Sequence, residues 1–144
     1  MRDYHIRGHE VEIDVRVEPG LPHVAVDEDQ FKQILINLLN NSIDAMEGMR
    51  TKRIRVEALC RGDRVIMSFD DSGPGFTNAN RAFDPFYTTK PVGKGTGLGL
   101  SICYGIVKEH GGDIHATNLD PHGARVTLEL PVHSAVSAEV ATAP

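Results

Sequence analysis

Two glycine-rich segments on either side of a long loop constrain the fold more than any other feature of this sequence. The first, Asp71 to Phe76, follows a strand-like segment, and the second, Gly93 to Ser101, leads into a helix-like one. The loop between them spans about twenty residues, a length that indicates a functional lid or a disordered linker in a compact domain. Its motifs favour a lid held between a strand and a helix.

Asp71 closes a run in which apolar and polar residues alternate. Val65, Met67 and Phe69 occupy every second position, so Asp71 shares their face of the strand and points inward at its end. A buried carboxylate needs a hydrogen-bonding partner. The amino group of adenine is one such donor, and the glycines that follow Asp71 leave room for a flat base.

The second glycine-rich segment continues into a helical pattern from about Leu98 to His110. Free backbone N–H groups and the positive end of the helix dipole favour phosphate at such a start. The loop also carries Arg81, Lys90 and Lys94 against one acid, Asp84, within a chain of formal net charge -5. For either glycine segment alone an ordinary turn is the favoured interpretation, but the ordered set favours a triphosphate site.

Composition limits the class of protein. The chain has 144 residues and is 40% hydrophobic, which fits one domain with a sizeable core. No apolar run approaches the ~18 residues of a membrane span, and the first residues do not form a signal peptide. Cys60 and Cys103 are isolated, which argues against a zinc site or a disulfide framework. We interpret them as core residues of a reduced, cytoplasmic protein, whose mild acidity gives no general attraction to nucleic acid.

A long helix is predicted before this region. Asp27 to Gln30 has the spacing of a capping box, and the apolar pattern continues to about Met49. On the side opposite the apolar arc, Asn37, Asn41 and Asp44 fall within roughly 60° of one another, at about 100° per residue. An amide oxygen can complete a magnesium shell, but asparagine is also common on wetted helix faces. The residues alone leave both interpretations open.

The remaining elements are read from alternation and turn residues. Gly111 and Gly112 mark the end of the second helix. The last residues, 134–144, are expected to fray. Strands are predicted at 11–17, 23–26, 53–60, 64–70, 113–117 and 124–130, with hairpin turns at 61–63 and 119–123.

Four motifs, in this order, resemble the catalytic, ATP-binding domain of bacterial sensor histidine kinases. Asp27 to Met46 resembles the N box, Asp71 to Gly75 the first glycine box, Phe83 to Lys90 the F box, and Gly93 to Ser101 the second glycine box. The superfamily also includes DNA gyrase, the large heat-shock chaperones and mismatch-repair ATPases. The pairing of the F box with the second glycine box favours the kinase branch, in particular relatives of nitrogen- and oxygen-sensing kinases.

The resemblance implies an α/β fold in two layers, a mixed sheet covered on one face by helices, of the Bergerat ATP-binding type. Pattern alone predicts at least five strands and two long helices, which agrees with this fold without being unique to it. The catalytic domain would occupy residues 1–133, followed by the tail.

The resemblance also assigns roles to residues. Asp71 would accept the adenine amino group and Asn41 would ligate Mg²⁺. Asn37 stands where hydrolysing relatives carry a glutamate, and an amide cannot act as a general base. Lys90 and Lys94 would neutralise the γ-phosphate, so with Asn37 they form the predicted catalytic set. The nucleotide-binding residues predicted besides these are Asp44, Gly73, Gly75, Phe86, Thr88, Thr89, Gly95, Thr96, Gly97, Leu98, Gly99 and Leu100.

The function implied is that of a protein histidine kinase, transferring the γ-phosphate of ATP to a histidine on a dimerisation domain outside this chain. His9 and Glu10 imitate an acceptor motif, but the following residues have strand periodicity. A response-regulator receiver domain would be the next partner, and the isolated domain is expected to be a cytoplasmic monomer, whose parent kinase could be membrane-anchored. One alternative is an ATP-binding regulatory or scaffolding module without phosphotransfer. Asn37 argues against a hydrolysing ATPase.

Two departures from the family pattern bear on the lid and the phosphate site. Residues 76–82 are shorter than usual, which puts the first lid helix in doubt. Asp44 replaces a basic residue common in relatives, which leaves phosphate neutralisation to the lid lysines. Within the F box, Phe83 and Phe86 are expected to anchor the lid or to dock the dimerisation domain; the alternative is that they pack a small core within the lid itself.

Overall fold

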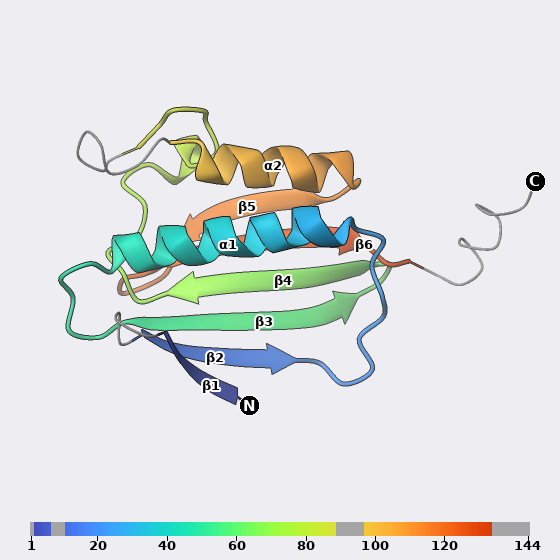
Figure 1. The fold of residues 1–144 in the computed structure, drawn as a ribbon, viewed down its shortest axis with the longest axis horizontal. Coiled ribbons are helices and arrows are strands. Elements are labelled where there is room, and N and C mark those ends of the chain that lie inside the picture. Colours follow the sequence, from blue (N-terminus) through green and yellow to red (C-terminus); the bar gives the residue numbers. More distant parts are fainter. Residues whose placement is uncertain (1, 7–10, 89–96, 134–144) are drawn as a thin grey trace, which may run out of the picture.

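In the computed structural model, a six-stranded mixed sheet carries two helices on one face (Figure 1). The structure describes residues 2–6, 11–88 and 97–133. The strand order is β1-β2-β3-β4-β6-β5. This arrangement confirms the two-layer α/β fold. The strands are β1 (Arg2–Ile6), β2 (Val11–Val17), β3 (Arg53–Arg61), β4 (Arg64–Asp71), β5 (Asp113–Asn118) and β6 (Ala124–Pro131), and the helices are α1 (Glu28–Ala45), α2 (Gly99–Glu109) and a short 3-10 helix, η1 (Ala79–Arg81).

The sheet is mixed because β2 and β3 are parallel and joined through α1, whereas every other neighbouring pair is antiparallel. The β3–β4 and β5–β6 hairpins confirm the predicted ones. The strand registers place Asp71 beside Ile54 on β3 and beside Ala124 on β6. Ala124 in turn pairs with Asn118 on β5. Asp71 therefore ends a central strand, with neighbours on both sides.

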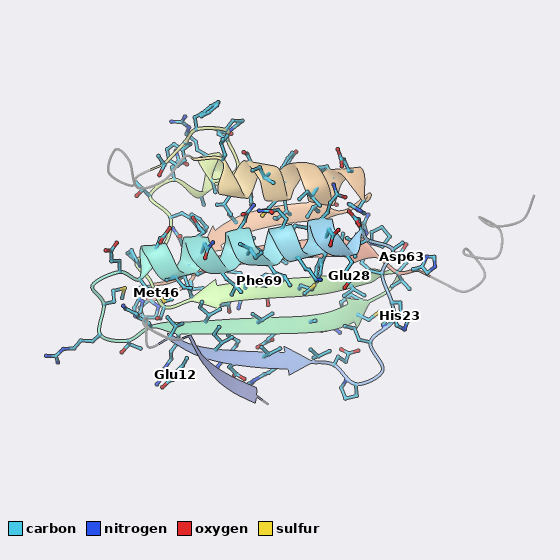
Figure 2. All side chains as sticks on the ribbon, in the orientation of Figure 1. Glu12, His23, Glu28, Met46, Asp63 and Phe69 are labelled. Atoms are coloured by element: carbon cyan, nitrogen blue, oxygen red, sulfur yellow. The ribbon has the colours of Figure 1, made fainter. Side chains whose placement is uncertain are left out.

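The core lies between the helices and the sheet, in two clusters. The larger cluster joins both helices to β4, β5 and β6, and includes Leu38, Phe69 and Leu128. The smaller one forms around Met46, just beyond α1, which packs on Val11 of β2. Figure 2 shows Phe69 beneath α1 and Met46 at its C-terminal end. These contacts fix α1 over the ends of the central strands.

The ends of α1 differ from the prediction. Asp27 is the N-cap residue, but its side chain makes no capping hydrogen bond, so the predicted capping box is wrong. The helix ends at Ala45 rather than near Met49, because Met46 leaves helical geometry and Gly48 takes a left-handed φ of 80°. Among the described residues, neither helix is long and apolar enough to cross a bilayer.

Two further predictions need correction or refinement. Residues 23–26 do not form a strand, because Val24 makes only an isolated bridge to Val132. Both cysteines are free thiols, but only Cys103 is fully buried, and burial raises the pKa of its thiol to about 11. Cys60 is half-buried near the β3–β4 turn. The C-cap prediction is confirmed, since Gly111 has a φ of 75° and the N–H of Gly112 donates to the Val107 carbonyl at 2.9 Å.

His110 joins the two helices at the end remote from the glycine-rich segments. The N–H of Asp27 donates to His110 Nε2 at 3.2 Å, and His110 Nδ1 lies 2.7 Å from the Ile106 carbonyl oxygen. Both contacts are satisfied together when the proton is on Nδ1, which donates to Ile106 while Nε2 accepts. One neutral imidazole thus links the start of α1 to the last turn of α2.

We expect His110→Ala to lower the free energy of unfolding by about 1–2 kcal/mol, because both hydrogen bonds are lost and the N–H of Asp27, the N-cap residue of α1, loses its acceptor. Urea unfolding followed by circular dichroism measures the change. His115→Ala, at an exposed position on β5, is the matched control. Equal unfolding midpoints for the two variants would contradict this role of His110.

Candidate nucleotide site

Three elements meet at one end of the molecule. The C-terminal end of β4, the C-terminal half of α1 and the start of α2 lie at the same side in Figure 1. Asp71 comes from β4, the two asparagines from α1, and Gly97 to Leu100 from the start of α2. The structure therefore brings together segments that are far apart in the sequence, as the predicted site requires.

Asp71 is inward-facing, as predicted, with only 7% of its surface exposed. Its Oδ1 accepts the N–H of Gly73 at 2.9 Å. Burial raises the pKa of Asp71 above its ordinary value of 3.8, against the lowering effect of hydrogen bonds from the Gly73 and Ala124 backbones and the Ser42 side chain. A carboxylate with unfavourable desolvation is suited to a ligand that brings a hydrogen-bond donor.

The turn after Asp71 is packed too tightly for most side chains. A Cβ on Gly73 would lie 3.0 Å from Asp71 Oδ1 and 3.4 Å from the Ala45 carbonyl oxygen. Gly75 has a φ of 92°, and a Cβ there would lie 2.8 Å from Asn118 Oδ1. The glycines predicted to shape the pocket are thus required by local packing and backbone conformation.

The amide stripe of α1 divides into different roles. Asn37 Nδ2 donates to the Gly99 carbonyl at 3.2 Å, and Gln33 Nε2 donates to Asn37 Oδ1 at 2.9 Å. Asn37 therefore ties the start of α2 to α1 within the described residues. Asn41 is half-buried one turn further along, and Asp44 lies exposed beyond it. Of the two asparagines, Asn37 has both ends of its amide engaged by protein groups.

The predicted residues at the start of α2 form a turn that leads into the N-terminal end of the helix. Gly97 has a φ of 71°, Leu98 is the N-cap residue without a side-chain capping bond, and the helix starts at Gly99 and Leu100. The backbone N–H groups of the first turn have no carbonyl one turn earlier in the helix. The helix dipole adds positive potential at the same place.

The described parts of the lid separate the two phenylalanines. Phe83 packs against the core and its ring centroid lies 5.9 Å from that of Tyr104. Phe86 is 74% exposed and has a left-handed φ of 66°, a conformation that is unfavourable for a bulky side chain. Its N–H donates to the Gly97 carbonyl at 2.9 Å. Phe83 therefore anchors the lid, whereas Phe86 is presented to solvent.

The first lid segment contains only η1, three residues of 3-10 helix, in line with the doubt raised by its shortness. Thr88 is exposed at the end of the described lid. The other predicted lid residues lie outside the described residues: Thr89, Lys90, Lys94, Gly95 and Thr96. His9 and the tail, residues 134–144, lie outside them as well.

Sequence reasoning missed three residues that support the site. Ser42 is buried beside Asp71 and forms a hydrogen bond with it. Asn118 binds the backbone of Phe76, and His122 Nδ1 lies 3.3 Å from the Gly73 carbonyl oxygen. Of the three, only Ser42 could have been found from a local pattern, because it lies four residues before Met46 and therefore on the buried side of the predicted helix. The contacts of Asn118 and His122 are long-range.

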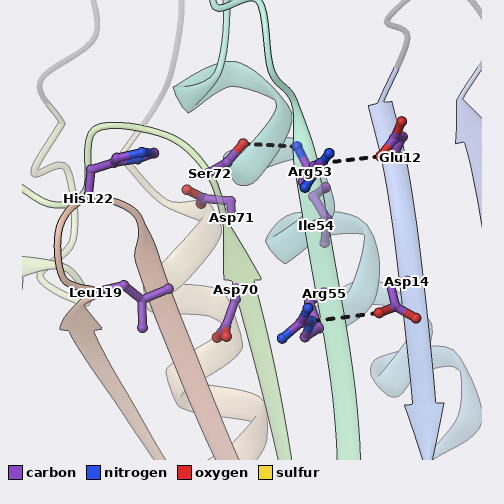
Figure 3. Close-up of a pocket in the computed structure, with 10 residues that line it drawn as sticks. All are labelled: Glu12, Asp14, Arg53, Ile54, Arg55, Asp70, Asp71, Ser72, Leu119 and His122. Carbon is purple, nitrogen blue, oxygen red and sulfur yellow. Dashed lines mark hydrogen bonds and ion pairs between the residues drawn. The ribbon is translucent and has the colours of Figure 1, made fainter.

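A hollow of about 490 Å³ lies at the same end of the sheet and reaches from Asp71 onto the face that the helices do not cover; in Figure 3 the helices lie behind the strands. Charged side chains of the open face line it, and Arg53 pairs with Glu12 at 3.3 Å while Arg55 lies 3.6 Å from Asp14. These ion pairs neutralise part of the charge around the hollow, which Asp71, Ser72 and His122 also line.

A mixed sheet covered by two helices, with a buried acid and a glycine-rich turn at one end, defines the class of ATP-binding catalytic domains with a two-layer α/β fold. Residues 26–134 match the family described as histidine kinase-, DNA gyrase B- and HSP90-like ATPase. The chain belongs to this family, as its motifs predicted.

Similar proteins are named as sensor kinases. Sensor histidine kinase ZraS of Escherichia coli O157:H7 is 38% identical over 126 residues, which are 86% of this chain and 27% of that protein. Sensor kinase CckA of Brucella abortus is 37% identical over 139 residues, covering 86% of this chain and 15% of that protein. The chain thus spans less than a third of the length of these relatives.

Solved structures give the same result. The catalytic domain of histidine kinase ThkA, in a nucleotide-free form, superposes with a TM-score of 0.73 at 33% identity, covering 85% of this chain and 79% of that one. Full-length ShkA in complex with AMPPNP superposes with a TM-score of 0.73 at 30% identity, covering 87% of this chain and 26% of that one. The chain is therefore an ATPase domain of the kind found in sensor histidine kinases.

Proposed function

We propose that this chain, over residues 1–133, is the catalytic domain of a two-component sensor histidine kinase, and that it transfers the γ-phosphate of MgATP to a histidine of a dimerisation domain. The observation that carries the proposal is the buried Asp71 carboxylate facing α1 across the glycine turn, in a chain whose relatives are named sensor kinases. The domain would act in the cytoplasm, and the phosphohistidine would then pass its phosphoryl group to a response-regulator receiver domain.

The residues suggest a division of labour around the nucleotide. Asp71 would accept the adenine amino group. The Asn41 oxygen is a hard donor that fits the Mg²⁺ accompanying the triphosphate, since this ion prefers oxygen ligands and retains water and phosphate oxygens. The N–H groups at the start of α2 would hold phosphate oxygens, and Lys90 and Lys94 would neutralise the γ-phosphate.

Asn37 supports transfer over hydrolysis. Its amide oxygen already accepts from Gln33 and its nitrogen donates to Gly99, and an amide has no basic site at ordinary pH. The domain would therefore position the phosphates rather than activate water. In the transfer step, an imidazole nitrogen attacks the γ-phosphorus with its lone pair while the bond to the ADP oxygen breaks. The exposed Phe86 would contact the dimerisation domain during this step.

Radiolabelled ATP tests the proposal. We expect the chain alone to bind ATP without becoming labelled, and to label the histidine of an added dimerisation domain from a similar sensor kinase with an acid-labile, base-stable bond. Several such dimerisation domains are tested, because they will differ in how well they dock on this chain. Tight ATP binding with no phosphohistidine on any of them would favour a regulatory or scaffolding module, and rapid acceptor-free turnover would favour a hydrolysing ATPase.

A further inference from the structure

Asn118, the last residue of β5, holds the far end of the turn that begins at Asp71. The N–H of Phe76 donates to Asn118 Oδ1 at 2.6 Å, and Asn118 Nδ2 donates to the Phe76 carbonyl at 3.0 Å. The amide thus binds both backbone groups of one residue, as a neighbouring strand would. Although Asn118 is exposed, both polar atoms of its side chain have partners.

The two ends of this turn are fixed in one row of the sheet. Asp71 on β4 pairs with Ala124 on β6, and Ala124 pairs with Asn118 on β5. The turn therefore leaves β4 at Asp71 and crosses the start of β6. It is then bound by Asn118, which lies in the same row of paired residues as Asp71. The position of Phe76 relative to Asp71 is set by this row of paired residues.

The surface under the turn is closely packed. A Cβ on Gly75 would lie 2.8 Å from Asn118 Oδ1 and 3.0 Å from the Gly123 carbonyl oxygen. The side chain of Phe76 packs against the larger core cluster. His122 adds a longer contact, at 3.3 Å, to the Gly73 carbonyl. The β5–β6 turn is therefore the support on which the glycine turn rests.

We propose that Asn118 is a positioning residue for nucleotide binding, which holds the glycine turn at the distance from α1 that an adenine ring requires. The proposal rests on the proposed function, because it takes Asp71 to be the residue that accepts the adenine amino group. Asn118 acts through the backbone of Phe76 rather than by touching the nucleotide. Its effect should therefore fall on the adenine end of the ligand and leave the phosphate end unchanged.

The test compares Asn118→Ala and Asn118→Asp with the parent chain, using adenosine, ADP and AMPPNP as probes in calorimetry. The aspartate retains an acceptor for the Phe76 N–H but places a second oxygen against the Phe76 carbonyl. Thr117→Ala, at the preceding exposed position, is the matched control. We expect Asn118→Ala to weaken all three ligands by about tenfold, the factor that corresponds to about 1.4 kcal/mol, and Asn118→Asp to weaken them by a similar factor.

Hydrogen exchange supplies a readout that needs no nucleotide. The Phe76 amide should exchange faster in Asn118→Ala and remain protected in Asn118→Asp and Thr117→Ala. Faster exchange with unchanged affinities would overturn the positioning role, and so would a loss confined to AMPPNP or unchanged exchange at Phe76. A parent chain that binds none of the three probes would overturn the proposed function itself, and the positioning role with it, before any variant is compared.

Discussion

Asp71→Asn is expected to weaken adenine-nucleotide binding by at least about a hundredfold. The Asn oxygen can still accept the Gly73 N–H that Asp71 accepts at 2.9 Å, but its NH₂ group then faces the adenine amino group, donor against donor. The complex loses a hydrogen bond to a charged group and leaves a buried donor unsatisfied, which together cost about 3–6 kcal/mol. Calorimetry with ADP and AMPPNP measures the loss.

Asp70→Asn is the matched control for this prediction. Asp70 precedes Asp71 on β4 and its carboxylate binds Arg125 through two contacts of 2.7 Å. Alternation along the strand directs it to the other face of the sheet. The control should retain parental nucleotide affinity even if the loss of this ion pair lowers stability slightly. Equal affinities in both variants would contradict the assignment of Asp71 to adenine.

The raised pKa of Asp71 adds a pH signature to the same prediction. Because the folded protein holds this proton more tightly than the unfolded chain, ionisation of Asp71 opposes folding as the pH rises from 3.8 through the raised pKa. Over that range the unfolding free energy of Asp71→Asn should increase relative to the parent and then level off. Nucleotide affinity of the parent should fall as the pH is lowered through the same range, because the donor favours the ionised acid.

Much of the fold could be predicted because its signals are local. The alternation that ends at Asp71 determined which face the acid takes, and a slip of one residue would have turned it outward. Gly62 lies in the predicted hairpin turn with a φ of 62°, and Gly111 ends α2. The family resemblance added the layer order, which periodicity alone did not determine.

The features that the sequence did not reveal depend on contacts between residues that are distant in the sequence. His110 receives the Asp27 N–H from 83 positions away, so the expected capping box had a competing partner that no local pattern reveals. Asn118 and Phe76 are 42 positions apart, and asparagine at the end of a strand normally indicates only a turn. Val24 has strand propensity but meets one bridging partner, because the chain continues directly into α1.

The sequence points to candidate ligand-facing residues more directly than to the residues that support them, for the same reason. Ligand-facing residues cluster in short motifs, whereas the residues that hold those motifs come from other elements. Asn37 illustrates the difference. The family resemblance places it in the nucleotide-binding and catalytic set, and in the structure its amide nitrogen donates to Gly99 while its oxygen accepts from Gln33. Under the proposed function, this leaves Asn41 as the residue of the stripe on which magnesium binding would depend most directly.

Asn41→Ala should lower phosphotransfer to an added dimerisation domain by about a hundredfold or more, because the metal loses a protein ligand that helps align the γ-phosphate. Asn40→Ala is the control, since Asn40 is the adjacent asparagine of α1 and is exposed whereas Asn41 is half-buried. Both substitutions change helix propensity equally. Phosphohistidine formation is measured under single-turnover conditions with saturating MgATP.

A titration without metal distinguishes ligation from a general weakening of the site. In EDTA, both variants should bind ADP as the parent does, because the adenine contact at Asp71 is untouched. With Mg²⁺ present, the affinity of Asn41→Ala for AMPPNP should fall by about tenfold while that of Asn40→Ala stays parental, which corresponds to about 1.4 kcal/mol for one metal–oxygen contact in competition with water. Weaker ADP binding by Asn41→Ala in EDTA would contradict magnesium ligation and instead indicate a structural role for Asn41 on α1.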